Sequence, residues 1–203
     1  MLRKIIVGLI PGIIVGGILA VVTADILLSV EVHAMQTTVN GWSTTMKCGV
    51  PGNNILLKAA CALLLPAANL PDEGVYWTAT VDGAGNRLSG QHNYILHFPP
   101  GGTPPNNAFW SLTMMNAKSL LVANLVNRYN VGNLSGLAAN ADGSIDIYIQ
   151  NAAPAGHETN WLPSAFPSIR SMRCPTWHRR PRKIPTCWWE RTTTRSTPSA
   201  SSI

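Results

Sequence analysis

Residues 75–90, VYWTATVDGAGNRLSG, contain two short runs separated by the turn sequence Asp82-Gly83. Valine, tyrosine, tryptophan and threonine favour strands, and an Asp-Gly pair between such runs is typical of a β-hairpin. The next segment, HNYILHFPPGGTPPN at residues 92–106, alternates its side chains between two faces and then stops at a Pro/Gly loop. These two segments predict antiparallel β-structure.

Downstream segments extend this pattern. AFWSLTMMN at residues 108–116 and SIDIYIQN at residues 144–151 also have a period of two, whereas SLLVANLVNRYNVG at residues 119–132 fits a short helix or a pair of strands. Several short strands with turn sequences at this spacing favour an antiparallel sandwich or jelly roll. The lack of βαβ alternation argues against a nucleotide-binding α/β fold.

One helix is predicted before the strands. ILLKAACALLLPAANL, at residues 55–70, has a broad apolar face, and Asn53 or Asn54 can cap its start. Pro66 is expected to end it. We expect this helix to cover an edge or face of the sheet. A short strand is expected around Val39–Trp42.

The N-terminus carries an apolar segment. Arg3 and Lys4 precede Ile5–Val22, which has no charge and is at the short end of a membrane span. Two interpretations compete: an uncleaved signal anchor, which we favour, and a cleaved export signal with small residues at Ala24 and Ala34. The basic residues predict that the N-terminus stays in the cytoplasm and that the rest of the chain lies outside it.

The positive charge lies almost entirely in the C-terminal tail. Residues 164–203 hold eight of the 15 basic and one of the nine acidic residues, a net +7. The other 163 residues hold seven basic and eight acidic side chains, a net −1. The near-neutral body gives no reason to expect a polyanion partner. The tail interleaves arginine with tryptophan, as some nucleic-acid binders do, but the predicted location outside the cytoplasm argues against a nucleic-acid partner.

The cysteines and histidines do not form a metal-binding pattern. No CxxC pair or Cys/His cluster occurs, so we predict no metal and no cofactor. A Cys48–Cys61 disulfide would be permitted outside the cytoplasm, but two unlinked, buried thiols are the simpler interpretation, which we favour. His92 and His97 are an odd number of residues apart on one strand and point to opposite faces, so His97 is interpreted as a hydrogen-bonded sheet residue.

Six motifs occur in order: VYWTATVDGAGNRLSG, NYILHFPPGGTPP, AFWSLTM, NRYNVG, ADGSIDIYIQ and NWLP. Together they resemble the bacterial "domain of unknown function 1214" family over roughly residues 50–163. The resemblance implies a jelly-roll-like β-sandwich in a short protein with an N-terminal membrane segment. Together with the apolar N-terminus and the charge distribution, it predicts three parts: a membrane anchor or signal segment at 1–34, a jelly-roll-like domain at 35–163, and a basic tail at 164–203. The expected location is the bacterial inner membrane, as a single-pass protein with a periplasmic domain.

The chain departs from the family pattern after NWLP. The resemblance implies a further strand with an arginine and an aromatic residue, then a Pro-rich edge segment. Here SAFPSIRSMRCPTWHRRPRKIP follows, a mixture of Trp, Cys, Arg, Pro and Ser. Our hypothesis is that a frameshift near residues 163–167 replaced the native C-terminus, so the tail is expected to be disordered or frameshifted.

Candidate ligand contacts cluster in the polar and aromatic motifs. No GxSxG or HExxH sequence occurs, so no catalytic residue is assigned. An arginine offers a planar fork for a carboxylate or sulfate, and aromatic faces can stack on a sugar ring. The predicted contacts are Trp110, Ser111, Asn127, Arg128, Tyr129, Asn160 and Trp161. The alternative is that Trp110 and Trp161 pack in the core and Arg128 ties a loop through backbone carbonyls.

Three functions follow from this interpretation. The first is a membrane-tethered, non-catalytic module of the cell envelope that binds a small molecule or carbohydrate. The second is a hydrolase acting on a small polar substrate, with Asp146 or a histidine as the general base. The third is a purely structural envelope protein. The family resemblance implies no settled biochemical activity.

Overall fold

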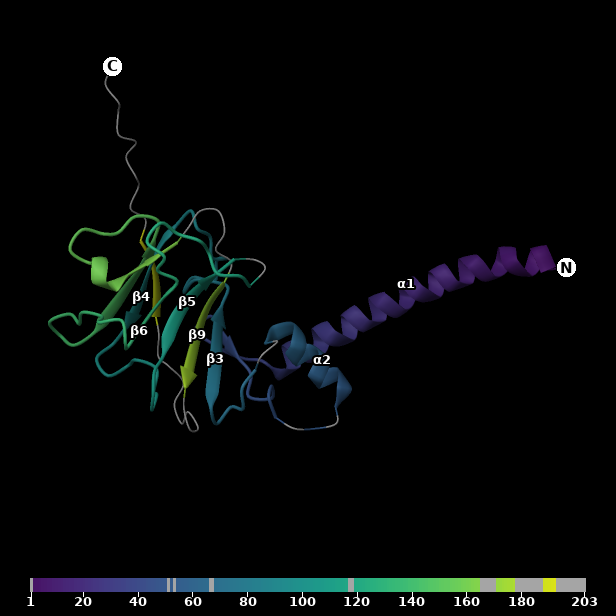
Figure 1. The fold of residues 1–203 in the computed structure, drawn as a ribbon, viewed down its shortest axis with the longest axis horizontal. Helices are drawn as coiled ribbons and strands as arrows, with labels where there is room; N and C mark the ends of the chain where they lie inside the picture. Colours follow the sequence, from purple (N-terminus) through teal and green to yellow (C-terminus); the bar gives the residue numbers. More distant parts are fainter. Residues whose placement is uncertain are drawn as a thin grey trace, which may run out of the picture. The chain divides into compact units, whose positions relative to one another are not determined.

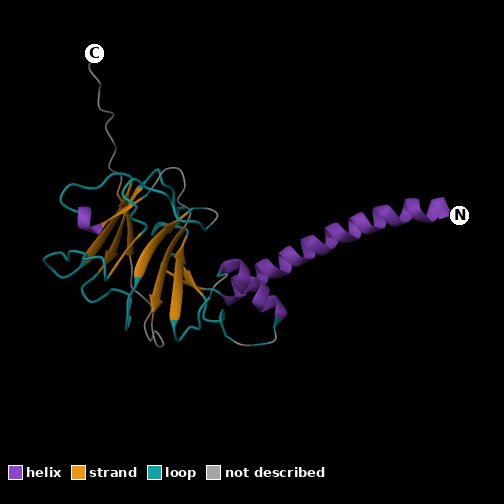
Figure 2. Cartoon of the chain, in the orientation of Figure 1, coloured by secondary structure: helices purple, strands orange, loops and turns teal. Residues whose placement is uncertain are grey.

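The structure is a computed structural model, and it describes residues 2–50, 52, 54–65, 68–116, 119–164, 171–177 and 188–192. The chain divides into two compact units. The helical unit comprises Met1–Gln36 and Thr45–Leu70, and the β-rich unit comprises Thr37–Thr44 and Pro71–Ile203. Figure 2 shows the helices in purple and the strands in orange. The described part of the chain is therefore mainly β, with two α-helices, of which the first is long and apolar.

Helix α1, Leu2–Met35, is the longest element of the described chain (Figure 1). Its 34 residues correspond to a length of about 51 Å. Leu9–Met35 is long and apolar enough to cross a membrane, a property that an N-terminal export signal shares. Its apolar side chains are largely exposed from Leu9 to Val30, as a lipid-facing helix requires.

Helix α2, Ile55–Leu64, begins where the Asn54 side chain accepts a hydrogen bond from the Leu57 backbone N–H at 3.0 Å. The predicted cap is therefore confirmed at Asn54, while Pro66 lies outside the described residues. The expected packing of this helix on the sheet stays a prediction. Its buried face packs against α1, because the last turns of α1 present a matching row of apolar side chains, Leu28, Val32 and Met35.

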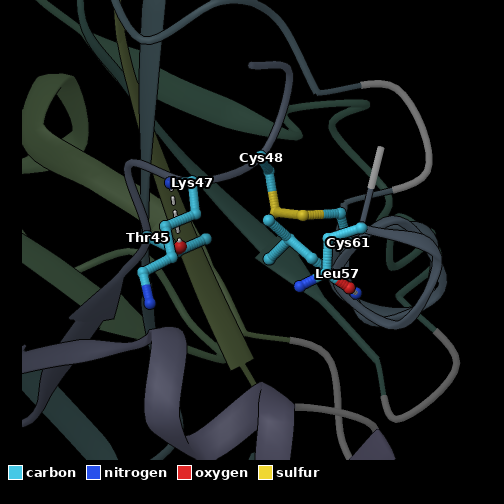
Figure 3. Close-up of a disulfide and its surroundings, with 6 residues drawn as sticks. Thr45, Lys47, Cys48, Leu57 and Cys61 are labelled. Carbon is cyan, nitrogen blue, oxygen red and sulfur yellow. Dashed lines mark hydrogen bonds between the residues drawn. A yellow bond between two sulfur atoms is a disulfide. The ribbon is translucent and has the colours of Figure 1, made fainter. Parts of the chain in front are cut away.

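A disulfide joins Cys48, in the segment before α2, to Cys61 on α2 (Figure 3). The two Cα atoms are 5.4 Å apart. The favoured interpretation of two unlinked thiols is therefore wrong. Cys61 lies on the helix face that turns back toward the loop, a proximity that spacing in the sequence does not encode.

Ten strands of the described chain form two sheets. The bounds are β1 Thr37–Val39, β2 Trp42–Thr44, β3 Gly74–Ala79, β4 Asn93–Phe98, β5 Ser111–Met115, β6 Asn130–Gly132, β7 Ile145–Gln150, β8 Trp161–Pro163, β9 Ser171–Trp177 and β10 Trp188–Thr192. The six-stranded sheet has the order β1-β2-β3-β9-β5-β6, and the four-stranded sheet has the order β10-β4-β7-β8. The pairings are antiparallel, as predicted, except that β7 and β8 run parallel.

The two sheets share one hydrophobic core. Its members come from both sheets, and Phe98 of β4 packs on Trp110, just before β5, with ring centroids 5.2 Å apart. The predicted alternation of side chains between two faces is confirmed: Tyr94, Leu96 and Phe98 are buried, while the intervening residues of β4 are half-buried. The same alternation buries Ile147 and Ile149 on β7, although Ile145 is only half-buried.

Turn-forming residues determine where several strands begin and end. The strand expected around Val39–Trp42 is instead a hairpin turn, because Asn40 and Gly41 have φ values of +50° and +79°. Asp82 forms the predicted turn, since its carboxylate accepts hydrogen bonds from the Ala84 and Asn86 backbone N–H groups.

The segment at residues 119–132, which fitted a helix or a strand pair, is not helical in its described residues. It is mostly irregular, with an isolated bridge between Met115 and Leu121 and the short strand β6 at its end. Gly132 ends β6 beside the neighbouring strand, where a Cβ would collide with the Trp110 carbonyl oxygen. Close approach of the two backbones therefore requires glycine at this position.

Two segments of the basic tail are strands. β9 lies between β3 and β5 in the six-stranded sheet, and β10 pairs with β4 at the edge of the four-stranded sheet. The expectation that the tail is disordered is therefore wrong for these two segments. β9 follows NWLP, where the family resemblance implies a further strand. The frameshift itself stays a prediction, and the rest of 164–203 lies largely outside the described residues.

Candidate functional site

A surface pocket of about 440 Å³ lies on the β-rich unit. It is lined by Val126, Asn127, Arg128, Ala153, Glu158 and Trp161. Three of the seven predicted ligand contacts, Asn127, Arg128 and Trp161, therefore come together. They arrive from the loop before β6 and from the start of β8, which are more than 30 residues apart in the sequence.

Arg128 is held firmly at this pocket. Its Nη1 donates to the Glu158 carbonyl oxygen at 2.7 Å, and its Nη2 donates to the Thr159 carbonyl oxygen at 2.6 Å. Asn124 fixes the backbone of Arg128 by donating to its carbonyl oxygen and accepting from its N–H. Partial burial lowers the pKa of Arg128 below its ordinary value, but guanidinium remains charged near neutral pH. The alternative role of Arg128 as a loop tie is thus confirmed, and a binding role stays a prediction.

The charge of Arg128 has no carboxylate partner within ion-pair distance in the described part of the chain. The guanidinium of Arg128 donates two hydrogen bonds to neutral carbonyl groups, and these use only some of its N–H donors. Glu158 lines the same pocket, but its carboxylate accepts from the Gly156 N–H at 3.1 Å. Hydrogen bonds from its own backbone N–H and from that of Gly156 lower the pKa of Glu158. The pocket therefore presents both a cation and an anion.

Trp161 supplies the aromatic wall of the pocket. The 3-10 turn Glu158–Asn160 precedes it, and its Nε1 donates to the Gln150 carbonyl oxygen at 2.8 Å. This hydrogen bond satisfies the indole N–H, so the half-buried ring is fixed with its remaining surface at the pocket.

The other predicted contacts do not line the pocket. Trp110 is only 2% exposed and packs in the core. Asn160 is buried and bridges the Ala138 backbone N–H and carbonyl and the Asp146 carbonyl. The Tyr129 hydroxyl donates to Asn127 at 3.2 Å, while Ser111 lies half-buried on β5. Trp110 and Asn160 thus have structural contacts that account for their burial.

A second cluster of polar side chains lies on the outer face of the four-stranded sheet. His97 Nδ1 and Asp146 Oδ1 are 2.7 Å apart, and Asp146 Oδ2 accepts from Asn140 at 2.9 Å. The prediction that His97 is a hydrogen-bonded sheet residue is confirmed. The pairing was missed because it depends on the register in which His97 of β4 faces Asp146 of β7. The available signal was the period-two pattern, which puts each of these polar side chains on the face opposite its apolar neighbours.

Tyr148 and His157 extend this polar face, with ring centroids 4.6 Å apart. Partial burial, followed by the nearby charge of Asp146, raises the pKa of Tyr148 above its ordinary value. Its hydroxyl therefore stays protonated at neutral pH. No group of three or more His, Cys, Asp or Glu side chains suited to a metal ion occurs among the described residues.

Comparisons with known proteins support the fold more than the function. The VPA0106 protein from Vibrio parahaemolyticus is 21% identical with a TM-score of 0.55, over 68% of this chain and 35% of its own. A putative uncharacterized protein from Burkholderia cenocepacia is 13% identical with a TM-score of 0.45, over 89% of this chain and 52% of its own. This chain thus spans about a third of the first protein and about half of the second.

No curated protein matches the chain in sequence. Residues 73–170 match the family described as "Protein of unknown function (DUF1214)". They include the hairpin sequence, the pocket and the His97–Asp146 pair. The family model therefore matches residues 73–170, and this is the family that the six sequence motifs resemble.

Proposed function

We propose that the chain is a membrane-tethered protein of the bacterial cell envelope, whose β-rich unit is a non-catalytic module that binds a small acidic carbohydrate. The ligand site is the pocket with Arg128 and Trp161. We also propose the finer features that the family resemblance implies, namely jelly-roll connectivity and a single-pass location in the inner membrane with the β-rich unit in the periplasm.

Helix α1 supports the tether, because its stretch Ile5–Ala24 contains no charged residue and is long and apolar enough for a lipid environment. Arg3 and Lys4 at its start favour the orientation with the β-rich unit outside the cytoplasm. The Cys48–Cys61 disulfide supports the same compartment, because disulfides persist in oxidising surroundings.

The observation that carries the binding proposal is the fixed position of Arg128 next to Trp161 at one pocket. A cation without a carboxylate partner among the described residues favours an anionic group on the ligand. A fixed indole favours a flat apolar face, such as one side of a sugar ring. Both side chains are held by backbone carbonyls, so little conformational entropy is lost when a ligand binds. A pocket of about 440 Å³ suits a small ligand.

We expect the detergent-solubilised full chain to bind uronic-acid oligosaccharides on a glycan array, and Arg128→Gln to weaken that binding at least tenfold. A charged hydrogen bond contributes about 1.5–3 kcal/mol, which corresponds to roughly a tenfold to hundredfold change. Trp161→Leu should also weaken binding, because it removes the stacking face. The matched control is Arg87→Gln, which removes one exposed positive charge away from the pocket.

Circular dichroism of each variant separates loss of binding from loss of fold. Equal binding by folded Arg128→Gln, Trp161→Leu and control would contradict the proposal. The same oligosaccharides, assayed for turnover, test the alternative of a hydrolase. His97 and Asp146 favour that alternative, since a carboxylate can orient an imidazole as a general base. Turnover that Asp146→Asn abolishes would replace the binding proposal with the hydrolase.

A further inference from the structure

A second pocket, of about 550 Å³, lies in the helical unit beside α2. Lys47 and Lys58 line it, and none of its lining residues is acidic. From this pocket, and from the position of α2 along α1, we propose that the helical unit is a membrane-surface collar. In this collar α2 lies in the interfacial layer and the two lysines bind the phosphates of anionic phospholipids. This inference deepens the proposed function and rests on its membrane tether.

The length of α1 sets the depth of the collar. Ile5–Ala24 contains no charged residue, and its 20 residues span about 30 Å, the thickness of a bilayer hydrocarbon core. Asp25 is the first charged residue after it. Leu28 is the first residue of α1 that packs against the apolar cluster shared by α1 and α2. It lies four residues past Ala24, or about 6 Å beyond the hydrocarbon core of the bilayer. The headgroup layer occupies this depth.

The outer side of α2 is apolar. Ile55 is 82% exposed and Leu63 is 66% exposed, although the opposite side of the helix already packs on α1. Both ends of α2 therefore present large aliphatic side chains to the surroundings. In a headgroup layer these side chains reach the acyl boundary, as in interfacial helices with apolar and basic residues. The collar is thus continuous with the apolar surface of α1.

The charge of the pocket matches a phosphate-rich surface. Lys47 lies just before Cys48, and Lys58 lies three residues before Cys61. The disulfide therefore fixes the two lysine-bearing segments together, and Figure 3 shows the bond with Lys47 next to Cys48. Asn54 also lines the pocket, and its side-chain oxygen caps α2 by accepting from the Leu57 backbone N–H. The lysines are exposed, and none of the described residues makes an ion pair with either of them. Anionic lipid would supply the missing negative charge.

The test uses the full chain reconstituted in phosphatidylcholine vesicles with or without one quarter phosphatidylglycerol, followed by native mass spectrometry of retained lipid. We expect retention of phosphatidylglycerol over phosphatidylcholine. Lys47→Gln and Lys58→Gln should each lower that preference about fivefold, because one basic side chain at an anionic surface contributes about 1 kcal/mol. Arg87→Gln is the matched charge control. Leu63→Ser should lower total lipid retention, and Leu134→Ser, at a 78% exposed site of the β-rich unit, should not.

Carbonate extraction of the same vesicles tests the tether separately. A chain that resists extraction but shows equal retention of both lipids, or no effect of either lysine variant, overturns the collar and leaves the tether standing. A chain that carbonate releases overturns the tether itself. If inorganic phosphate displaces phosphatidylglycerol at millimolar concentration from the wild-type pocket, the site is a free-phosphate site and the lipid assignment is wrong.

Discussion

Phe98→Ala is expected to lower the free energy of unfolding of the β-rich unit by about 3–5 kcal/mol. Phe98 is fully buried on β4, and its ring packs against Trp110 next to β5, so it joins the two sheets. Removing the ring deletes buried apolar surface and leaves a cavity that neighbouring strands cannot close without losing their hydrogen-bonded register. Urea unfolding of the detergent-solubilised chain, followed by near-ultraviolet circular dichroism, measures the change.

Ile95→Ala is the control for Phe98→Ala, because Ile95 lies on the same strand with its side chain on the outer face. It should cost about 1 kcal/mol or less, since a half-buried side chain on the outer face loses little burial. Equal effects of the two substitutions would show that the two sheets do not share the core that joins Phe98 to Trp110.

Loss of the Cys48–Cys61 disulfide is expected to destabilise the helical unit by about 3 kcal/mol, the value for closing a loop of roughly 15 residues. The cysteines are 13 residues apart, and the crosslink restricts the unfolded chain. The double variant Cys48→Ser/Cys61→Ser should therefore increase hydrogen exchange in α2 more than a hundredfold.

The control for the disulfide is Cys174→Ser/Cys187→Ser, which removes the two tail cysteines and leaves the bond in place. It should leave exchange in α2 unchanged. Unchanged exchange in the Cys48→Ser/Cys61→Ser variant would mean that packing of α2 on α1 alone holds the helix, and the crosslink would then contribute little.

The faces of the strands were predictable because side-chain alternation is a local property. Tyr94, Leu96 and Phe98 alternate with half-buried neighbours, so the sequence alone separates the two faces of this strand. The α2 cap was predictable for the same reason, since Asn54 acts on a backbone N–H three residues away. Contacts between residues a few positions apart can therefore be predicted from sequence patterns.

Pairings between distant segments were not predictable. The apolar face of α2 is as well suited to a helix as to a sheet, so the sequence did not indicate that this face packs on α1. Cys48 and Cys61 likewise meet because α2 turns Cys61 toward the preceding loop. The basic composition of the tail obscured β9, whose strand conformation depends on pairing with β3 and β5 on its two sides.

The candidate site was predicted in part. Residue chemistry identified Asn127, Arg128 and Trp161, which line one pocket. The type of side chain alone did not distinguish these residues from Trp110 and Asn160, because an aromatic ring or a carboxamide can pack in a buried network as well as contact a ligand. Burial decides between these roles, and burial depends on the assembled sheets.

The most direct test of the central proposal, a membrane-tethered module outside the cytoplasm, is the accessibility of a single cysteine in bacterial spheroplasts. Leu134→Cys places a thiol at an exposed position of the β-rich unit, in a Cys174→Ser/Cys187→Ser background. We expect a membrane-impermeant maleimide to label it in intact spheroplasts and the labelled chain to stay in the membrane pellet after carbonate extraction. Labelling only after lysis, or release of the labelled chain as a soluble protein, would contradict the proposal.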